Sequence, residues 1–510
     1  MTGIGRNPRG FPRSRIYGVT PDTLPSPAAL GLTLLKIARL VVALWLCGFA
    51  ACAVAQAQDP PAPPEAKSEP AAEPSAEEQV PDAPLDEEGA VDDAAVDAAA
   101  VDADIASQEL SDDAKVRLDA ARESVVQIRG FFHGSDSSAF HGSGFAVDDG
   151  RRILTNYHVV AQAVLYPRQY RLEYLASDGR EGLLHVLAID VRNDLAVVAA
   201  DDFELPPLKL RTAIPDQGER AWSIGFPLNL GLTITEGVAN GLVENSIEQR
   251  VHYTGAINLG MSGGPALDRR GRVYGVNVSV VTGRQLVGFV VPAMHIPALL
   301  ARAKEPLTQQ FSALQLRQGV TAQVLAYEAE VLEARPEAAG TQEVRGYVLP
   351  TQISRHVECS TIDERGPHVR VRVETVSCRI PSRLVVQGGA YVAGLSMQHR
   401  ILRSGELHPL QFERQVNRLA ASARRTGVSA HVAPFACHDG LVSLDGFDAR
   451  ISTCVRQYRL FAGLYDFDVT VVGIDDPQQA LVSRLALQGV AFDTGERILE
   501  RYLGALQWKP

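Results

Sequence analysis

The sequence predicts a mostly β region over residues 114–304, of sandwich or barrel type, followed by an α+β unit over residues 345–510. Many short β-like runs, separated by Gly, Pro, Asp and Asn turns, fill the first region from Val125-Val126-Gln127-Ile128 onward. Four cysteines and two helix-ended segments mark the second unit. A chain of 510 residues is also too long for one ordinary domain, which favours two folded units.

Residues 1–57 have the features of an export signal. Six basic residues precede an uncharged apolar run from Leu40 to Ala55, and Ala55-Gln56-Ala57 is a small-x-small cleavage site. The run has 16 residues, fewer than the ~20 that cross a bilayer, so a cleaved signal peptide is favoured. A membrane tether by an uncleaved segment and lipid attachment at Cys52 are the alternatives.

Residues 58–113 read as a disordered linker. The segment is rich in Pro and Ala, has no aromatic residue, and carries 18 Asp or Glu against the single Lys67. It has too little apolar surface to offset the entropy of ordering. The net charge of the chain is −11. The linker contributes −17 and residues 1–57 contribute +5, so residues 114–510 carry about +1. This near-neutral balance gives no indication of nucleic-acid binding.

The folded region begins with Ser111-Asp112-Asp113-Ala114, which predicts the start of a helix through Arg122. It ends in a predicted helix from Ile296 to about Lys304, with Pro297 in the first turn, where its missing N–H would have no partner. Residues 305–344 read as a connector with helical stretches.

A serine among glycines, Gly260-Met261-Ser262-Gly263-Gly264-Pro265, is a candidate nucleophile on a tight turn. Glycine lets the backbone N–H groups of Gly260 and Ser262 point to one spot, where a developing oxyanion would be held. A serine hydroxyl needs a base, so the motif alone also fits a plain turn.

A candidate base and its orienting group lie upstream. His158 follows the β-like run Arg152-Ile153-Leu154, which predicts that it lies at the end of a strand. Asp194 precedes the apolar run Leu195-Ala196-Val197-Val198, and Asp190 is its competitor. Histidine, aspartate and then serine is one of the known chain orders of a catalytic triad. Taken singly, each residue also has an ordinary structural explanation.

The region from about Ser138 to Ala303 resembles the protease domain of the HtrA/Deg family of trypsin-like serine proteases. Eight segments carry the resemblance: Gly142-Ser143-Gly144-Phe145, Ile153 to Val160, Asn193 to Val198, Ile224 to Pro227, Thr233 to Gly237, Ala256 to Pro265, Gly271 to Asn277, and Val287 to Pro292. The resemblance implies an all-β, chymotrypsin-like double β-barrel, with the triad His158, Asp194 and Ser262 in the cleft between the barrels. It requires no cofactor and no metal.

The resemblance also bounds the specificity. It places Ala256 at the floor of the primary specificity pocket and Asn277, Val278 and Ser279 along its wall. An alanine offers no carboxylate to a cationic side chain, so we expect cleavage after small or medium aliphatic residues. Three residues depart from the family pattern: Leu259 replaces a usual proline, and Tyr157 and Met261 each replace a usual asparagine. A methionine cannot pair with a freed N-terminal amine, which disfavours activation by N-terminal clipping.

The unit over residues 345–510 reads as a tandem repeat. Cys359 and Cys378 bracket one β-like segment, Cys437 and Cys454 bracket another, and each bracket is followed by a strand and a helix with similar sequence. In an exported protein, four cysteines imply two disulfides, and local pairing is the simplest of three connectivities. Zinc is the rival, but no Cys-x-x-Cys spacing supports it. A PDZ domain, usual here in the family, is not recognisable.

The expected function is that of an exported, periplasmic or envelope serine endopeptidase that degrades unfolded or damaged proteins. Its partners would be polypeptide substrates, and family members tend to form trimers. The alternatives are a poorly active protease-like binding or scaffold protein, and a signalling protease with one native target.

Overall fold

The computed structural model describes most of the chain beyond the predicted linker. The described residues are 112–200, 204–227, 230–244, 246–280, 287–334, 340–364, 370–382, 384–387, 390–422, 431–473 and 476–509. The predicted export signal and nearly all of the predicted linker lie outside these ranges. Within them, no helix is both long and apolar enough to cross a membrane.

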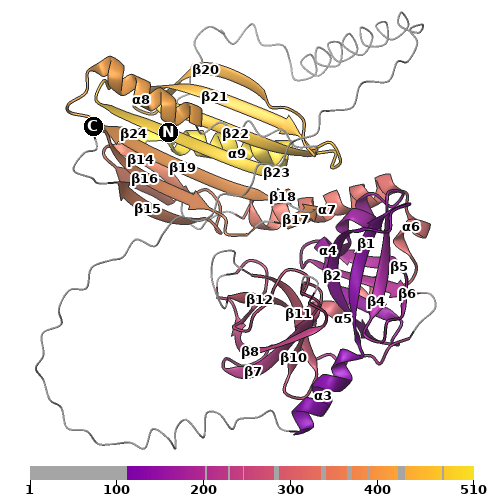
Figure 1. Cartoon of the computed structure of the whole chain (residues 1–510). Helices are drawn as coiled ribbons and strands as arrows, with labels where there is room; N and C mark the ends of the chain where they lie inside the picture. Colours follow the sequence, from indigo (N-terminus) through magenta and orange to yellow (C-terminus); the bar gives the residue numbers. More distant parts are fainter. Residues whose placement is uncertain are drawn as a thin grey trace, which may run out of the picture. The chain divides into compact units, whose positions relative to one another are not determined.

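The mostly β region consists of two closed, six-stranded antiparallel barrels, which confirms the predicted double-barrel fold (Figure 1). The strand order in the first barrel is β1-β2-β3-β6-β5-β4 and in the second β10-β11-β12-β9-β8-β7. The strands are β1 (Val125–Phe132), β2 (Ser138–Val147), β3 (Arg152–Thr155), β4 (Tyr170–Ala176), β5 (Glu181–Asp190), β6 (Leu195–Ala200), β7 (Glu219–Gly225), β8 (Thr233–Leu242), β9 (Val251–Tyr253), β10 (Pro265–Asp268), β11 (Val273–Val280) and β12 (Gly288–Pro292).

Alternating side chains on the barrel strands serve two cores. On β1, Val126 and Ile128 belong to the core that fills the first barrel. Val125 points the other way and packs in a second core with Trp222 and Leu267 of the second barrel. Successive side chains of a strand face opposite sides, so one strand both fills its own barrel and joins the neighbouring barrel. The apolar runs of the sequence therefore hold the two barrels together.

Short helices flank the barrels, and a longer one follows them. They are α3 (Asp112–Arg122), α4 (Tyr157–Leu165), the 3₁₀ helix η2 (Ala293–His295), α5 (Ile296–Arg302), α6 (Leu307–Gln310) and α7 (Ala313–Val331). The sequence predicted α3 and α5 closely. In α7, Ser312 and Gln315 form a reciprocal capping box that defines where the helix begins.

The C-terminal part is α+β and is built on a seven-stranded antiparallel sheet with the order β15-β16-β19-β23-β22-β21-β20. Its elements are β13 (Gly340–Val344), β14 (Tyr347–Gln352), β15 (Glu358–Glu364), β16 (Arg372–Arg379), β17 (Leu384–Gln387), β18 (Ala390–Val392), β19 (Gly394–Arg403), α8 (Pro409–Ser422), β20 (Ala436–Leu444), β21 (Phe447–Gln457), β22 (Leu464–Gly473), β23 (Gln479–Ala491), α9 (Phe492–Ala505) and β24 (Gln507–Trp508). Helix α8 packs on one face, against Leu402 and Val482. Helix α9 packs through Ile498 and Tyr502 in the core that contains Met397 and Ile401.

Two disulfides, Cys359–Cys378 and Cys437–Cys454, join the outer hairpins of this sheet. Each links residues that are opposite each other in register, on β15–β16 and on β20–β21. This is the local pairing that the sequence favoured. Each half of the sheet then ends in a helix, but the first half contributes three strands to the sheet and the second four. The internal repeat therefore stays a prediction.

A buried polar chain crosses the C-terminal core. His399 is fully buried, and its Nε2 donates to the carbonyl oxygen of Pro350 at 2.9 Å because a carbonyl can only accept. Its Nδ1 lies 2.7 Å from Oγ of Ser483 and therefore accepts from that hydroxyl. Tyr502 in turn is hydrogen-bonded to Ser483. Burial lowers the pKa of His399 to about 4, so the neutral ring is the folded form.

We expect this histidine to make the chain less stable in mild acid. Below about pH 6.5 the unfolded chain gains a proton at this residue, whereas the folded chain does not until about pH 4. The free energy of unfolding should fall between these values by at most about 3 kcal/mol. Urea unfolding at pH 7 and pH 4.5 measures the loss. His399→Gln, which can keep both hydrogen bonds without titrating, should lose less stability, and an equal loss in both proteins would contradict the assignment.

Candidate active site

His158 lies in the first turn of α4 and not at the end of a strand, so that prediction was wrong. Strand β3 ends at Thr155, and Asn156 has extended backbone angles and precedes the helix. Seven of the nine helix residues are buried, so the segment lacks the polar face that reveals a surface helix in a sequence. The helix start gives His158 a fixed position beside the first barrel.

The carboxylate of Asp194 holds His158 at two points. Oδ2 lies 2.7 Å from Nδ1 of the imidazole, and Oδ1 accepts the backbone N–H of the same histidine at 2.9 Å. Asp194 has a left-handed backbone, with φ of 59°, just before β6. The side chain of Asn156 supports this turn by donating to the carbonyl oxygen of Asp194 at 2.8 Å. Because a carboxylate only accepts, Nδ1 of His158 carries a hydrogen.

The charge of Asp194 sets the protonation of His158. Burial by itself would lower the histidine pKa, but the charge of Asp194 and the hydrogen bond to it outweigh burial, and the pKa is raised above its ordinary value. Asp190 was the competing candidate for the orienting carboxylate. Within the described ranges, its carboxylate does not bond His158 but accepts the backbone and side-chain N–H groups of Asn193.

The turn before Ser262 has the backbone shape of a type II turn. The N–H of Met261 donates to the carbonyl oxygen of Asn258 at 2.9 Å, and Gly260, the third residue of the turn, has φ of 96°. A side chain at Gly260 would place its Cβ 2.4 Å from the carbonyl oxygen of Phe226. Within the described residues, no protein acceptor takes the N–H of Gly260 or of Ser262. These two N–H groups are therefore the candidate donors to an oxyanion.

Met261 anchors this turn by burial. Its side chain is fully buried and packs in the core of the second barrel with Val251, Tyr253 and Ala266. Removing such a side chain from a core costs about 2–5 kcal/mol. A buried apolar side chain thus stands where the family pattern has a polar residue. The sequence shows that methionine replaces asparagine here, but not that its side chain is buried in the core of the second barrel.

Ser143 joins the first barrel to the turn that carries Ser262. Its hydroxyl donates to the carbonyl oxygen of Gly260 at 2.7 Å and accepts the N–H of Phe226 at 2.9 Å. Its backbone N–H donates to the carbonyl oxygen of Ser262 at 2.8 Å. Ser143 is fully buried, so these bonds are not weakened by competing water. The sequence comparison included Ser143 in a matching segment but assigned it no role.

The structure brings α4 and the Ser262 turn together at Gly142. A Cβ added to Gly142 would lie 2.7 Å from the methyl groups of Val159 and 3.3 Å from the carbonyl oxygen of Ser262. The hydroxyl of Ser262, however, donates to the carbonyl oxygen of Val278 at 3.0 Å. No hydrogen bond joins it to His158 in the described part of the chain. The segments of the candidate nucleophile and base thus meet at Gly142, while the two side chains are not hydrogen-bonded to each other in the described residues.

The residues predicted for the specificity pocket occupy different environments. Ala256 is exposed, and its carbonyl oxygen accepts from the hydroxyl of Thr235 at 2.8 Å. Val278 is nearly buried, while Leu259, beside the Gly260 turn, is 78% exposed. Asn277 is fully buried, and its amide donates to the carbonyl oxygens of Ile224 and Pro265. Its side chain therefore supports the second barrel. The side chain of Ser279 is outside the described set.

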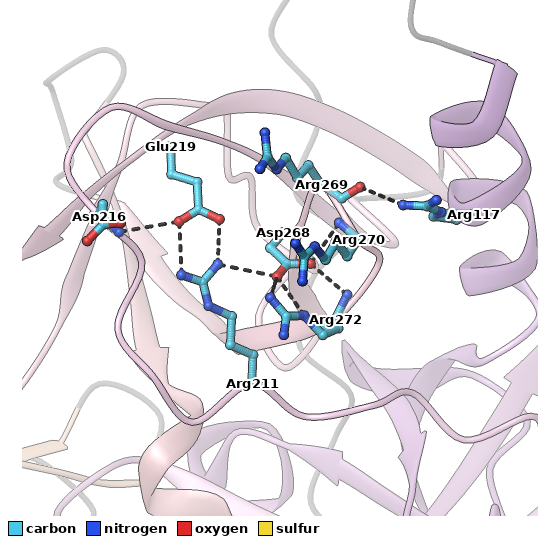
Figure 2. A network of polar contacts seen from close by, with 8 residues as sticks. All are labelled: Arg117, Arg211, Asp216, Glu219, Asp268, Arg269, Arg270 and Arg272. Carbon is cyan, nitrogen blue, oxygen red and sulfur yellow. Dashed lines mark hydrogen bonds and ion pairs between the residues drawn. The ribbon is translucent and has the colours of Figure 1, made fainter.

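A charged network holds the hairpin that follows Ser262. Asp268 ends β10 with a nearly buried carboxylate, which accepts from the backbone N–H groups of Arg270 and Arg272 and from the guanidinium groups of Arg211 and Arg272 (Figure 2). Burial would raise the pKa of Asp268, but these hydrogen bonds outweigh it and lower the pKa. The network stays ionised at neutral pH and fixes the β10–β11 turn.

The same network continues to the first described helix. Arg211 also pairs with Glu219, and a guanidinium nitrogen of Arg117 on α3 donates to the carbonyl oxygen of Arg269 (Figure 2). These contacts thus fix β10, the strand that directly follows the Ser262 turn, from outside the second barrel.

The fold and the geometry agree with the family comparison. Residues 142–276 match the profile of the trypsin-like peptidase domain, and this part of the chain is such a domain. It is similar to proteases of the HtrA type. It is 32% identical over 170 residues to a probable periplasmic serine endoprotease, DegP-like, of Chlamydia trachomatis, covering 32% of this chain and 33% of that protein.

Two further matches are also to proteases. The mitochondrial serine protease HTRA2 of Drosophila pseudoobscura pseudoobscura is 33% identical over 184 residues, which cover 34% of this chain and 42% of that protein. The solved Rv3671c protease of M. tuberculosis, in its active form, is 24% identical with a TM-score of 0.33, covering 38% of this chain and 86% of that one. The chain spans a third to two fifths of the length of these curated relatives.

Proposed function

We propose that the chain is an exported serine endopeptidase in which Ser262 is the nucleophile, His158 the general base and Asp194 the orienting carboxylate. The observation that carries the proposal is the double contact between Asp194 and His158, at 2.7 Å and 2.9 Å, beside a serine turn with two free N–H groups. A carboxylate that holds one imidazole nitrogen leaves the other free to take a proton from a hydroxyl.

The reaction would begin with rotation of the Ser262 hydroxyl from Val278 toward His158. The serine oxygen then attacks the peptide carbonyl carbon while Nε2 of His158 takes the hydroxyl proton. The resulting oxyanion accepts from the N–H groups of Gly260 and Ser262. His158 next gives its proton to the leaving amine, which departs and leaves an acyl-enzyme. Water, deprotonated by the same histidine, hydrolyses this ester and regenerates Ser262.

The residues at the predicted specificity pocket support cleavage after small or medium aliphatic residues. Ala256 carries no charge, and the exposed Leu259 adds an apolar edge next to the oxyanion turn. A buried carboxylate would be needed to accept Lys or Arg. Cleavage-site sequencing of a peptide library measures this preference. We expect Ala, Val, Leu or Ile before the cut bond, at least tenfold over Lys, and a preference for Lys or Arg would contradict the pocket assignment.

We propose unfolded or damaged envelope proteins as substrates and export as the route to them. Residues 1–57 have the pattern of a signal peptide, and one relative bears the name of a periplasmic endoprotease. Unfolded casein and a folded, disulfide-bonded protein serve as paired substrates. Rapid cleavage of casein alone supports a quality-control role, whereas cleavage of one native protein only would support a signalling protease.

A binding or scaffold protein is the second candidate, and one observation favours it. Ser262 donates its hydroxyl to Val278 rather than to His158. A protein that stays in this state with peptide bound would hold polypeptides without cutting them.

A further inference from the structure

Helix α7 contacts both segments that carry the His158–Asp194 pair. Near its start, the guanidinium of Arg317 donates twice to the carbonyl oxygen of Leu165, the last residue of α4, at 2.9 and 3.1 Å. In its middle, the side-chain oxygen of Gln323 accepts the N–H of Val191, three residues before Asp194, at 2.9 Å. Near its end, Glu330 pairs with Arg192. That ion pair is exposed and contributes little. The other contacts are partly buried.

Strand β17 holds α4 from the C-terminal part of the chain. The hydroxyl of Tyr157, the residue before His158, donates to the carbonyl oxygen of Val386 at 2.9 Å, and both residues are fully buried. One turn further along α4, Gln162 accepts from the amide of Gln387 at 3.1 Å. Burial and the charge of Asp194 raise the pKa of Tyr157, so its hydroxyl remains a donor at any working pH. Val386, Val320 and Val324 share one core with Val160 and Val164 of α4.

These contacts hold α4 at its start, through Tyr157, in its middle, through Gln162, and at its end, through Leu165. The turn that carries Asp194 is held through the N–H of Val191. His158 and Asp194 come from these two segments, and their hydrogen bond depends on how the segments are placed relative to each other. A displacement of about 1 Å at a reacting group can cost about 100-fold in rate. The residues of α7 and β17 that make these contacts are more than 120 positions away from the pair in the sequence.

We propose that α7 and β17 position the His158–Asp194 pair, so that Tyr157 and Gln323 are positioning residues and the C-terminal part of the chain is a built-in support of the active site. The proposal rests on the proposed function of that pair. Under it, loss of either contact slows the chemical step and leaves substrate binding unchanged. A contact that serves only to join the two parts of the chain would change stability and not the chemistry.

Two pairs of variants test the proposal in the full-length protein. Tyr157→Phe removes one hydroxyl, and its matched control is Tyr502→Phe, another buried tyrosine whose hydroxyl bonds Ser483 within the C-terminal core. Gln323→Leu leaves the N–H of Val191 without an acceptor, and Gln323→Glu restores an acceptor oxygen. We expect kcat for a peptide substrate to fall about three- to tenfold in Tyr157→Phe and Gln323→Leu, with KM unchanged. Tyr502→Phe and Gln323→Glu should keep wild-type kcat.

The pH profile separates positioning from plain stability. The charged groups near the pair are Asp194, Asp190 and Arg250, with the neutral phenol of Tyr157. The charge of Asp194 raises the histidine pKa against the effect of burial. If Tyr157→Phe or Gln323→Leu lengthens the contact between Asp194 and His158, the histidine pKa should fall. The acid limb of kcat/KM should then move to lower pH in both variants. Tyr502→Phe, which adds no charge, should keep the wild-type limb.

The outcomes distinguish this inference from the proposed function. If Ser262→Ala is inactive while Tyr157→Phe and Gln323→Leu keep wild-type kcat and pH profile, only the positioning role fails. If Ser262→Ala keeps full activity, the proposed function itself fails. Thermal unfolding of each variant identifies one that is unfolded at the assay temperature. For such a variant, kcat and the pH profile are measured at a lower temperature where it is folded, and an unchanged acid limb there also overturns the proposal.

Discussion

Ser262→Ala is expected to reduce peptide hydrolysis by about 10⁶-fold, to the level supported by binding and the oxyanion donors alone. Ser262 is the only part of the candidate site that would form a covalent bond, and no other serine has the same combination of a glycine-rich turn and two free N–H donors in the described residues. The substitution removes one oxygen atom on a turn that Ser143 and Met261 hold in place. Stability should change little, and thermal unfolding checks this.

Labelling with a fluorophosphonate measures the same event without a peptide substrate. The reagent forms a covalent bond only with a serine that has an activating base and a formed oxyanion site. We expect one label on the wild-type protein, none on Ser262→Ala, and one on Ser360→Ala, a control at an exposed serine of β15. No labelling of the wild type, even with unfolded protein present, would support the binding-protein alternative. The Ser262–Val278 hydrogen bond would then describe the working state.

Asp194→Asn should lower kcat by about 10⁴-fold near neutral pH while leaving the fold intact. The asparagine amide would donate toward Nδ1 of His158, which favours the tautomer with the hydrogen on Nε2. That nitrogen can then no longer accept the serine proton. The substitution also removes the charge that raises the pKa of His158, so burial would lower that pKa.

The matched control is Asp190→Asn, four residues earlier. In the described residues, the hydrogen bonds to its carboxylate come from Asn193 of its own turn, so kcat should change by no more than a few-fold. Steady-state rates for both variants from pH 5 to pH 9 decide between the two aspartates. In the wild type, activity should be lost as the pH falls through a histidine pKa above the ordinary 6.5. A larger loss in Asp190→Asn than in Asp194→Asn would reverse the assignment.

Much of the barrel fold was predictable from the residues because its signals are local. Short β-branched runs between turn residues predict strands wherever they occur, and the two six-stranded barrels confirmed the predicted fold. Glycine at position 260 could be read as a turn because only glycine adopts its φ of 96° without strain. Cysteines close in sequence could be paired because a short hairpin brings them together. His158, Asp194 and Ser262 remain predictions in their roles, although the structure places their segments side by side.

The contacts that complete the site were not readable from the sequence. His158 was assigned to a strand end because buried residues on all sides of α4 hide the helical period. The three hydrogen bonds of Ser143 and the support of α4 by α7 and β17 join residues that are far apart in the chain. The burial of Met261 depends on how the second barrel closes around it. By itself the sequence indicated the short strands, the glycine-rich turn and a local pairing of the cysteines, since each depends on backbone preferences within a few residues. The family resemblance added the closure of the strands into two barrels. Only the tertiary structure decided how the turn, the base and its carboxylate are held, because that depends on contacts between residues 36 to 229 positions apart in the chain.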